Sequence, residues 1–295
     1  MSTNKRDRLA SNPRVVLCDG LSRIPWLIHG FSTRCGGVSK AYGGHALNLG
    51  YTKHDTQAAV EENRGILLRS LGAINAGQPW PLARLRQVHS DIIQRVDRPP
   101  EQLLTGDGLV TDTPGLVLAV QTADCLPVLL VDTKRRAVAA FHAGWRGTLA
   151  RIVEKGVGAM RLHFGSEPGD LQAAIGPGIG SCCYTVGEDV RDQFHTQFAD
   201  ASTLFREVTE ANPVREKYPL LFRNARVPRP SNAGQTIYLD LREANRRQLL
   251  VAGLSPTKIS VLDFCTACRT DLFFSHRAEK GITGRQMALV GISDL

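Results

Sequence analysis

The sequence has no long hydrophobic run and no apolar segment at its start. Residues Met1 to Pro13 are polar and basic, so they lack the apolar core of a secretory signal. The longest apolar stretches, such as residues 126–131, are far shorter than the roughly 20 residues that cross a bilayer. We therefore expect a soluble, cytoplasmic protein without a membrane partner, and a disordered tail over residues 1–13.

Signatures of nucleic-acid-binding modules are also absent, although the formal net charge is +8. The basic residues are scattered, and no helix-turn-helix, RRM or zinc-finger pattern occurs among them. A positive charge of this kind is equally typical of an enzyme that attracts small anions such as phosphate. We therefore expect small-molecule substrates and no nucleic-acid partner.

The cysteines do not form the pattern of a disulfide framework. There are seven, an odd number, so we expect buried apolar residues, metal ligands or nucleophiles. Cys265 and Cys268 form the single Cys-x-x-Cys pair, whereas a structural zinc site usually has two such pairs. We interpret this pair as core packing or a redox-sensitive site.

What the sequence does contain is a series of apolar segments with helical or strand periodicity. Because one hairpin interrupts the alternation of strands and helices, we expect an α/β or α+β fold with a mixed sheet. Residues 14–295 are predicted to form one catalytic domain, with a polar variable loop or insertion near 199–234. Helices are predicted over 56–71, 149–164, 186–198 and 239–252, and strands over 26–33, 116–120, 126–132, 137–141, 171–175 and 259–262.

The most informative segment is the predicted hairpin that closes over residues 133–136. Its symmetry places His142 opposite Pro127, and Cys125 lies two positions away on the same face. Diagonal neighbours of this kind have Cα atoms about 7–8 Å apart. Cys125 and His142 are therefore expected to share one metal ion or to form a nucleophile–base pair.

A third candidate ligand is His89, at the end of another apolar run. One thiolate and two imidazoles leave a fourth position open, which is the pattern of a catalytic zinc site. Beyond His142, Gly144 allows close backbone approach, and Arg146 lies where a helix begins and an anion is favoured.

Together these segments resemble the YfiH-like family, also labelled peptidoglycan-editing-factor-like, laccase-domain or purine nucleoside phosphorylase proteins. The resemblance covers most of the chain, and the combination of TADC with HAGWRG downstream is specific. The matching motifs are residues 29–39 (HGFSTRCGGVS), 47–50 (LNLG), 62–64 (ENR), 87–89 (QVH), 106–108 (GDG), 122–125 (TADC), 142–147 (HAGWRG), 175–180 (IGPGIG), 183–184 (CY), 274–277 (FSHR) and 283–285 (TGR).

The resemblance implies an α+β fold, a four-layer α/β/β/α sandwich related to proposed cysteine hydrolases. It implies zinc held by His89, Cys125 and His142, in a monomer or small homo-oligomer. It also implies phosphorolysis of adenosine, inosine, guanosine or methylthioadenosine, and deamination of adenosine. The segment 199–234 is longer and more charged than we expect for a compact member.

Each reaction needs further groups. Deamination requires an acid to protonate the leaving amine, and Asp124 and Asp107 are candidates. Asp124 precedes Cys125 in a strand-like segment, so its side chain points to the opposite face. The alternative interpretation of Asp124 is a structural role.

Phosphorolysis requires an anion site for the phosphate. Arg34, Arg146 and Arg277 are candidates because a guanidinium forms forked hydrogen bonds to phosphate. Each is also interpretable as a solvated or salt-bridged residue. Asn48 is a candidate for binding ribose, or alternatively for stabilising the turn at Gly50.

Three other functions remain open at this point. Cys125 and His142 would suit a metal-free hydrolase or amidase that edits peptidoglycan precursors. A copper polyphenol oxidase (laccase) is less favoured, because none of the eight histidines forms a His-x-His pair. In a non-enzymatic protein, the same residues would hold a structural metal.

Overall fold

The computed structural model describes residues 14–209 and 235–294. The predicted tail, and much of the predicted insertion, lie outside these residues. The chain divides into two compact units, one of Met1–Gly180 with Leu241–Leu295 and one of Ser181–Asp240.

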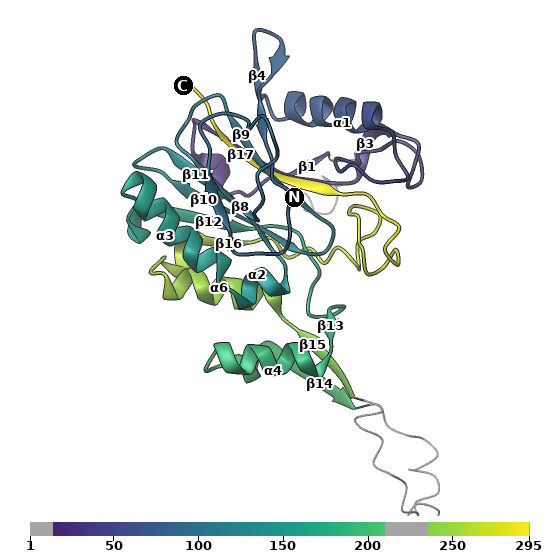
Figure 1. The fold of residues 1–295 in the computed structure, drawn as a ribbon, viewed down its shortest axis with the longest axis vertical. Helices are drawn as coiled ribbons and strands as arrows, with labels where there is room; N and C mark the ends of the chain where they lie inside the picture. Colours follow the sequence, from purple (N-terminus) through teal and green to yellow (C-terminus); the bar gives the residue numbers. More distant parts are fainter. Residues whose placement is uncertain (1–13, 210–234, 295) are drawn as a thin grey trace, which may run out of the picture. The chain divides into compact units, whose positions relative to one another are not determined.

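The first sheet of the larger unit is built around the C-terminal strand (Figure 1). Its neighbours pair antiparallel except for β6, which runs parallel to β9. In order across the sheet, the strands are β1 (Val15–Val16), β2 (Leu27–Ser32), β17 (Gln286–Ile292), β9 (Val117–Thr122) and β6 (Leu82–Ala83).

The second sheet contains the predicted hairpin at its centre. Parallel pairs at both edges flank antiparallel pairs in the middle, so the prediction of a mixed sheet in an α+β fold is confirmed. In order, the strands are β16 (Ile259–Val261), β12 (Leu171–Ile175), β10 (Leu126–Asp132), β11 (Ala137–Ala143), β8 (Gly108–Thr111) and β7 (Ile93–Arg95).

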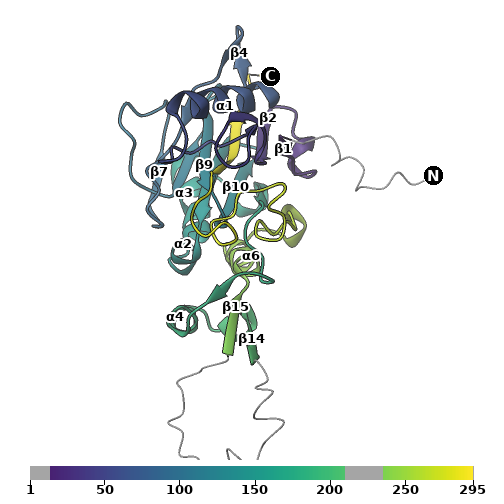
Figure 2. The ribbon, with the colours of Figure 1, turned by 90° about the vertical axis from the view of Figure 1, so that its right-hand side faces the viewer.

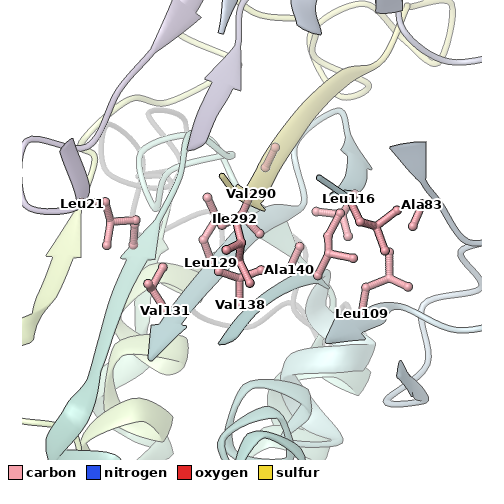
Figure 3. Close-up of a cluster of buried hydrophobic side chains, with 14 of the residues drawn as sticks. Leu21, Ala83, Leu109, Leu116, Leu129, Val131, Val138, Ala140, Val290 and Ile292 are labelled. Atoms are coloured by element: carbon pink, nitrogen blue, oxygen red, sulfur yellow. The ribbon is translucent and has the colours of Figure 1, made fainter. Parts of the chain in front are cut away.

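The main core lies between the two sheets. Side chains alternate along each strand, so Leu129 and Val138 of the second sheet meet Val290 and Ile292 of the first (Figure 3). The intervening residues of the same strands face helices instead. Strands β10 and β11 are consequently buried along their whole length, which explains their continuous apolar runs.

Helices cover the two outer faces of the paired sheets. Leu67 of α1 (Gln57–Ser70) packs with Ala119 and Leu289 on the first sheet. Helices α3 (Ile152–Phe164) and α6 (Leu241–Val251) contact the second sheet. The two perpendicular views show α1 on one side and α2, α3 and α6 on the other (Figures 1 and 2).

A side-chain cap sets the start of α1, whereas a left-handed residue interrupts the helix predicted over 149–164. The Thr56 hydroxyl accepts a hydrogen bond from the Ala59 N–H, which caps α1 near its predicted start. The predicted helix over 149–164 is wrong at its N-terminal end. The structure has α2 (Trp145–Leu149) and then α3, because Arg151 takes a left-handed φ of 61° between them.

The smaller unit contains helix α4 (Glu188–Gln197) and a three-stranded antiparallel sheet. Phe194 of α4 packs edge-on against Phe205 of the sheet, with ring centroids 5.8 Å apart. Its strands in order are β13 (Thr185–Val186), β15 (Gln235–Leu239) and β14 (Phe205–Thr209).

The remaining described elements are short. Each described helix in either unit is too short or too polar to span a bilayer. The short strands are β3 (Cys35–Ser39), β4 (Ile74–Asn75) and β5 (Gln78–Pro79), and the 3-10 helices are Leu21–Arg23, Pro168–Asp170, Ala201–Leu204 and Pro256–Lys258.

Candidate active site

The hairpin of β10 and β11 has the predicted register. Pro127 pairs with His142, and Leu126 pairs with Ala143. Cys125 immediately precedes β10, so its side chain falls on the same side as that of His142. The thiol and the imidazole therefore meet at the open end of the hairpin, on the face directed toward the first sheet.

His89 lies in a tight loop at the end of its apolar run. Its φ is 60°, in the left-handed region, and the loop is fastened by the buried carboxylate of Asp107. That carboxylate accepts hydrogen bonds from the backbone N–H groups of Val88, His89 and Ser90, at 3.2, 3.1 and 2.6 Å. Three donors converging on one carboxylate fix the position from which the imidazole of His89 projects.

The three predicted metal ligands lie together. The Cys125 sulfur is 3.8 Å from Nε2 of His89, and the rings of His89 and His142 are 4.8 Å apart at 76°. One potential ligand atom from each residue lies within 4.8 Å of the others. Bond lengths of about 2.0–2.3 Å in a tetrahedral zinc site place ligand atoms about 3.5 Å apart, so the donor set fits with small adjustment.

Asp107 also orients His142. The Nδ1 of His142 lies 2.8 Å from Oδ1 of Asp107, which leaves Nε2 directed toward Cys125. A carboxylate on the far nitrogen of a ligating histidine fixes the ring and its tautomer. Burial disfavours the charged form of Asp107, but hydrogen bonds from His142 and Ser90 outweigh it and hold the pKa of the carboxyl well below its usual range.

The thiol and the imidazole shift one another's ionisation. Burial alone would raise the pKa of the Cys125 thiol, but the nearby imidazoles of His142 and His89 lower it to about 6. Burial likewise opposes the charge on His142, while the Cys125 thiolate and Asp107 raise its pKa to about 9. The lowered pKa favours the thiolate of Cys125 at neutral pH, the form that binds metal or attacks carbon.

Gly144 makes room for this cluster. A Cβ at this position would lie 2.9 Å from the Cys125 sulfur and 3.0 Å from Cδ2 of His89. Both distances fall below normal van der Waals separation, so the glycine is required by close approach rather than by its backbone angles, which are φ −73° and ψ 174°.

Asp124 precedes Cys125 in a left-handed turn with φ 88°. Its buried carboxylate accepts hydrogen bonds from the hydroxyls of Thr266 and Ser275, both at 2.7 Å, and from the Arg277 N–H at 2.6 Å. These contacts tie the turn before Cys125 to the segment that contains Ser275. The Asp124 carboxylate is therefore hydrogen-bonded within the protein, and it does not line the cavity beside the candidate ligands.

A cavity of about 500 Å³ opens beside the three candidate ligands. Arg84, Arg86 and Arg285 line it together with Gln87 and Gln121, and none of its lining residues is Asp or Glu. Such a cavity favours an anion beside a polar, uncharged group. A larger cavity of about 660 Å³ runs along β1 and β2, but it contains none of the candidate ligands, so we locate the site in the smaller one.

The four residues predicted to bind substrate lie outside the lining of this cavity. Arg34 pairs with Glu279 at 3.0 Å and donates to two backbone carbonyls. Arg146 is exposed and stacks on Trp145, 4.3 Å from the ring centroid. Arg277 is exposed, and its backbone N–H is the group that contacts Asp124.

Asn48 acts on the cavity wall indirectly. Its side chain is fully buried and donates to the Gly50 carbonyl, as the predicted turn requires. Its Oδ1 also accepts the backbone N–H of Arg285 at 2.9 Å, so the amide joins the turn to an arginine of the cavity.

Sequence reasoning missed the arginines of the cavity wall. Arg285 ends a motif that the resemblance included, and Arg86 directly precedes another, so a signal was present for these two. Arg84 belongs to none of the motifs, and only the fold brings it beside the candidate ligands. The contribution of Asp107 to the positions of both histidines was likewise invisible in the spacing.

Comparison with known proteins gives a consistent family. Residues 28–293 match the family model described as multi-copper polyphenol oxidoreductase laccase. The chain is 38% identical to "Purine nucleoside phosphorylase" of Deinococcus radiodurans, over 90% of this chain and 88% of that protein. It is 36% identical to "Purine nucleoside phosphorylase YlmD" of Geobacillus stearothermophilus, over 90% and 89%. The crystal structure of a Bacillus licheniformis hypothetical protein YfiH covers 96% of this chain and 98% of its own, with a TM-score of 0.78 at 33% identity.

Proposed function

The chain belongs to the multi-copper polyphenol oxidoreductase laccase family, and from this premise we propose that it is a zinc-dependent purine nucleoside phosphorylase. Its relatives with that name support a general nucleoside phosphorylase role. The observation that carries the proposal is the convergence of His89, Cys125 and His142 beside a cavity with three arginines and no carboxylate. The proposed substrates are inorganic phosphate and adenosine, inosine, guanosine or methylthioadenosine.

Zinc is the metal that the donor set favours. One thiolate and two imidazoles are typical ligands of a catalytic zinc site with an open fourth position. Copper fits the family description in name, but multicopper centres need many imidazoles, and this chain has eight histidines with no His-x-His pair. A bound zinc ion would supply a Lewis acid that polarises a substrate oxygen or nitrogen.

The protein's own residues would bind and orient the reactants. In phosphorolysis, an oxygen of phosphate bonds to C1′ of the ribose while the bond between C1′ and the purine nitrogen breaks. The arginines of the cavity would hold the phosphate. Asp107 would hold His142 in one tautomer through Nδ1, which keeps Nε2 directed into the site.

Deamination of adenosine is the finer part of the same proposal. Both acids considered for protonating the leaving amine are buried, and their carboxylates accept hydrogen bonds from the protein. We therefore propose Asp124 and Asp107 as positioning residues. Asp124 would hold the turn that presents Cys125, and Asp107 would hold both histidines.

A second candidate function is supported by the same contacts. The contacting side chains of Cys125, His142 and Asp107 have the order of a thiol nucleophile, a base and an orienting carboxylate. The pKa of the thiol is lowered to about 6. A metal-free hydrolase or amidase that acts on peptidoglycan precursors would use this arrangement. Stoichiometric zinc bound through the Cys125 thiolate would oppose this alternative.

The test is an assay of the purified protein with adenosine, with and without phosphate. Release of adenine and ribose 1-phosphate only when phosphate is present indicates phosphorolysis, whereas inosine formed without phosphate indicates deamination. Cys125→Ala is expected to abolish both products and zinc binding. Absence of any purine product from the zinc-loaded wild type with each proposed nucleoside would overturn the proposal.

A further inference from the structure

Arg84 is a half-buried cation whose guanidinium has no hydrogen-bond acceptor among the described residues. It lies on the wall of the cavity that holds Cys125 and His142 and also borders a smaller cavity beside Glu61. Its Cζ is 5.7 Å from the centroid of the Tyr51 ring. A guanidinium carries five N–H donors in a fixed fork. In Arg84 these donors are available to a ligand.

The neighbouring arginines differ in this respect. Arg86 directs Nε and Nη2 to the Thr105 hydroxyl, at 3.2 and 2.8 Å. Arg285 directs Nη1 to the carbonyls of Thr283 and Gly284, at 3.2 and 2.8 Å. Their charges contribute to the potential of the cavity, but part of their donor capacity is already used. Arg84 is therefore the best-suited arginine for a new forked contact.

The charges around Arg84 also favour an anion. Arg64 stacks on the same Tyr51 ring, with Cζ 4.4 Å from the centroid. Glu61 is the carboxylate beside them, and it pairs with Arg64 at 2.9 Å and accepts the Tyr51 hydroxyl. Two guanidiniums thus share one carboxylate, and that carboxylate is bound to Arg64. Burial first, and the charge of Arg64 second, hold the pKa of Arg84 below its usual range; an anion would relieve both effects.

We propose that Arg84 binds inorganic phosphate through a forked pair of hydrogen bonds, with the charges of Arg86 and Arg285 supporting it. That this phosphate is the one consumed in phosphorolysis rests on the proposed function above. The position on the wall of the cavity containing His89, Cys125 and His142 places the anion beside the same site. Arg84 thereby becomes the residue that determines phosphate affinity rather than nucleoside affinity.

The test measures phosphate binding without any nucleoside. Isothermal titration of the zinc-loaded protein with inorganic phosphate, at constant ionic strength, compares wild type with Arg84→Gln and Arg84→Lys. Loss of a forked, charge-assisted contact is expected to weaken binding by about 10- to 100-fold in Arg84→Gln. Arg84→Lys keeps the charge but loses the fork, so an intermediate affinity is expected.

The matched control is Arg161→Gln, which removes the same charge from the surface of α3. Arg161 is 67% exposed, lies 3.8 Å from Glu167 and does not line the cavity, so phosphate affinity should stay within twofold of wild type. Thermal melting checks the fold of each variant. If Arg84→Gln does not fold, Arg84→Lys alone decides, because unchanged phosphate affinity in it contradicts a forked contact. Absence of phosphate binding by wild type, or unchanged affinity in Arg84→Gln, overturns the inference.

Kinetics separate this inference from the proposed function. Arg84→Gln should raise the KM for phosphate at least 10-fold, in line with the lost contact, and leave the KM for the nucleoside within about twofold. If wild type binds phosphate through Arg84 but releases no purine, the proposed function fails and the anion site stands. If wild type is a phosphorylase and the KM for phosphate is unchanged in the variant, the anion site fails and the function stands.

Discussion

Oδ1 of Asp107 lies 2.8 Å from Nδ1 of His142 and also accepts the backbone N–H of His89 at 3.1 Å. One buried carboxylate therefore fixes two of the three proposed metal ligands, although they come from different parts of the sequence. The third, Cys125, follows Asp124, whose carboxylate fastens its own turn. Two buried aspartates thus position the whole candidate metal site without lining the cavity.

Asp107→Asn should weaken zinc binding by about 10- to 100-fold, the usual effect of removing a carboxylate that orients a ligating histidine. An amide carries no charge, and its N–H₂ group cannot accept the backbone N–H groups that now converge on Asp107. The measurement is competition for zinc against a chromogenic chelator. Ser90→Ala is the matched control, because it removes one hydroxyl from the same carboxylate and should change zinc affinity only severalfold. Equal zinc affinity in Asp107→Asn and wild type would contradict the positioning role.

Gly144→Ala should disturb the candidate ligands while leaving the backbone unstrained. The new methyl group would approach the Cys125 sulfur and the His89 ring to about 3 Å, so one ligand must shift, and we expect at least a 10-fold loss of zinc affinity, a typical effect of misplacing a ligand.

Gly158→Ala provides the contrasting substitution. Gly158 lies in α3, where an added Cβ meets no atom within 4 Å. Alanine there should stabilise the protein by about 0.5–1 kcal/mol and leave zinc binding unchanged. The pair is compared by thermal melting and by zinc competition. Normal zinc affinity in Gly144→Ala would show that the site tolerates the methyl group.

Local patterns in the sequence predicted those features that depend on neighbouring residues. The register of β10 and β11 followed from a short connection and the period of two along a strand, and Pro127 does pair with His142. The helix predicted over 56–71 differs from α1 (Gln57–Ser70) by one residue at each end. The break at Arg151 was missed, because an amphipathic pattern can continue through a single left-handed residue.

Features that depend on the tertiary fold could not be predicted in this way. Arg84 and Arg285 line one cavity only because β6 and β17 belong to the same sheet, on either side of β9. Arg34 was predicted to bind phosphate because it lies in a motif. Its actual partner, Glu279, lies far along the chain, so the ion pair could not be predicted from neighbouring residues. Asn48 was predicted to contact ribose or a turn, and the structure gives its contacts with the turn and with Arg285.

Alkylation of the metal-free protein should single out Cys125. Its pKa is lowered to about 6, so the thiolate fraction and the alkylation rate should reach half of their plateau near pH 6. Cys35 is an internal control, because burial raises the pKa of its thiol above the ordinary value and slows its reaction at neutral pH. Peptide mass spectrometry after timed exposure to iodoacetamide at pH 5–9 gives both rates, and zinc should protect Cys125 but not Cys35, which is in no candidate metal group. A midpoint near that of an ordinary thiol would contradict the electrostatic contribution of the two histidines.

His29 should make the folded state sensitive to acid. It is 5% exposed, its Nε2 accepts the Cys18 N–H at 3.1 Å, and burial lowers its pKa to about 4. The unfolded chain, with an ordinary pKa of 6.5, binds a proton more readily than the folded protein between these values. Stability is therefore fully present above pH 6.5 and is lost as the pH falls toward 4, by about 3 kcal/mol in total.

His29→Gln removes this proton-linked loss and retains an acceptor for the Cys18 N–H. Urea unfolding at pH 4.5–7.5 should show that wild type loses more stability on acidification than the variant, by about 2–3 kcal/mol. Both proteins should carry Cys125→Ala, which removes the thiolate of the candidate metal site from the comparison. Because other titrating groups are common to the pair, their effects cancel when the two curves are subtracted. Parallel pH profiles would mean that His29 is protonated at little cost in the folded state, and that the cavity along β1 and β2 admits enough water to solvate it.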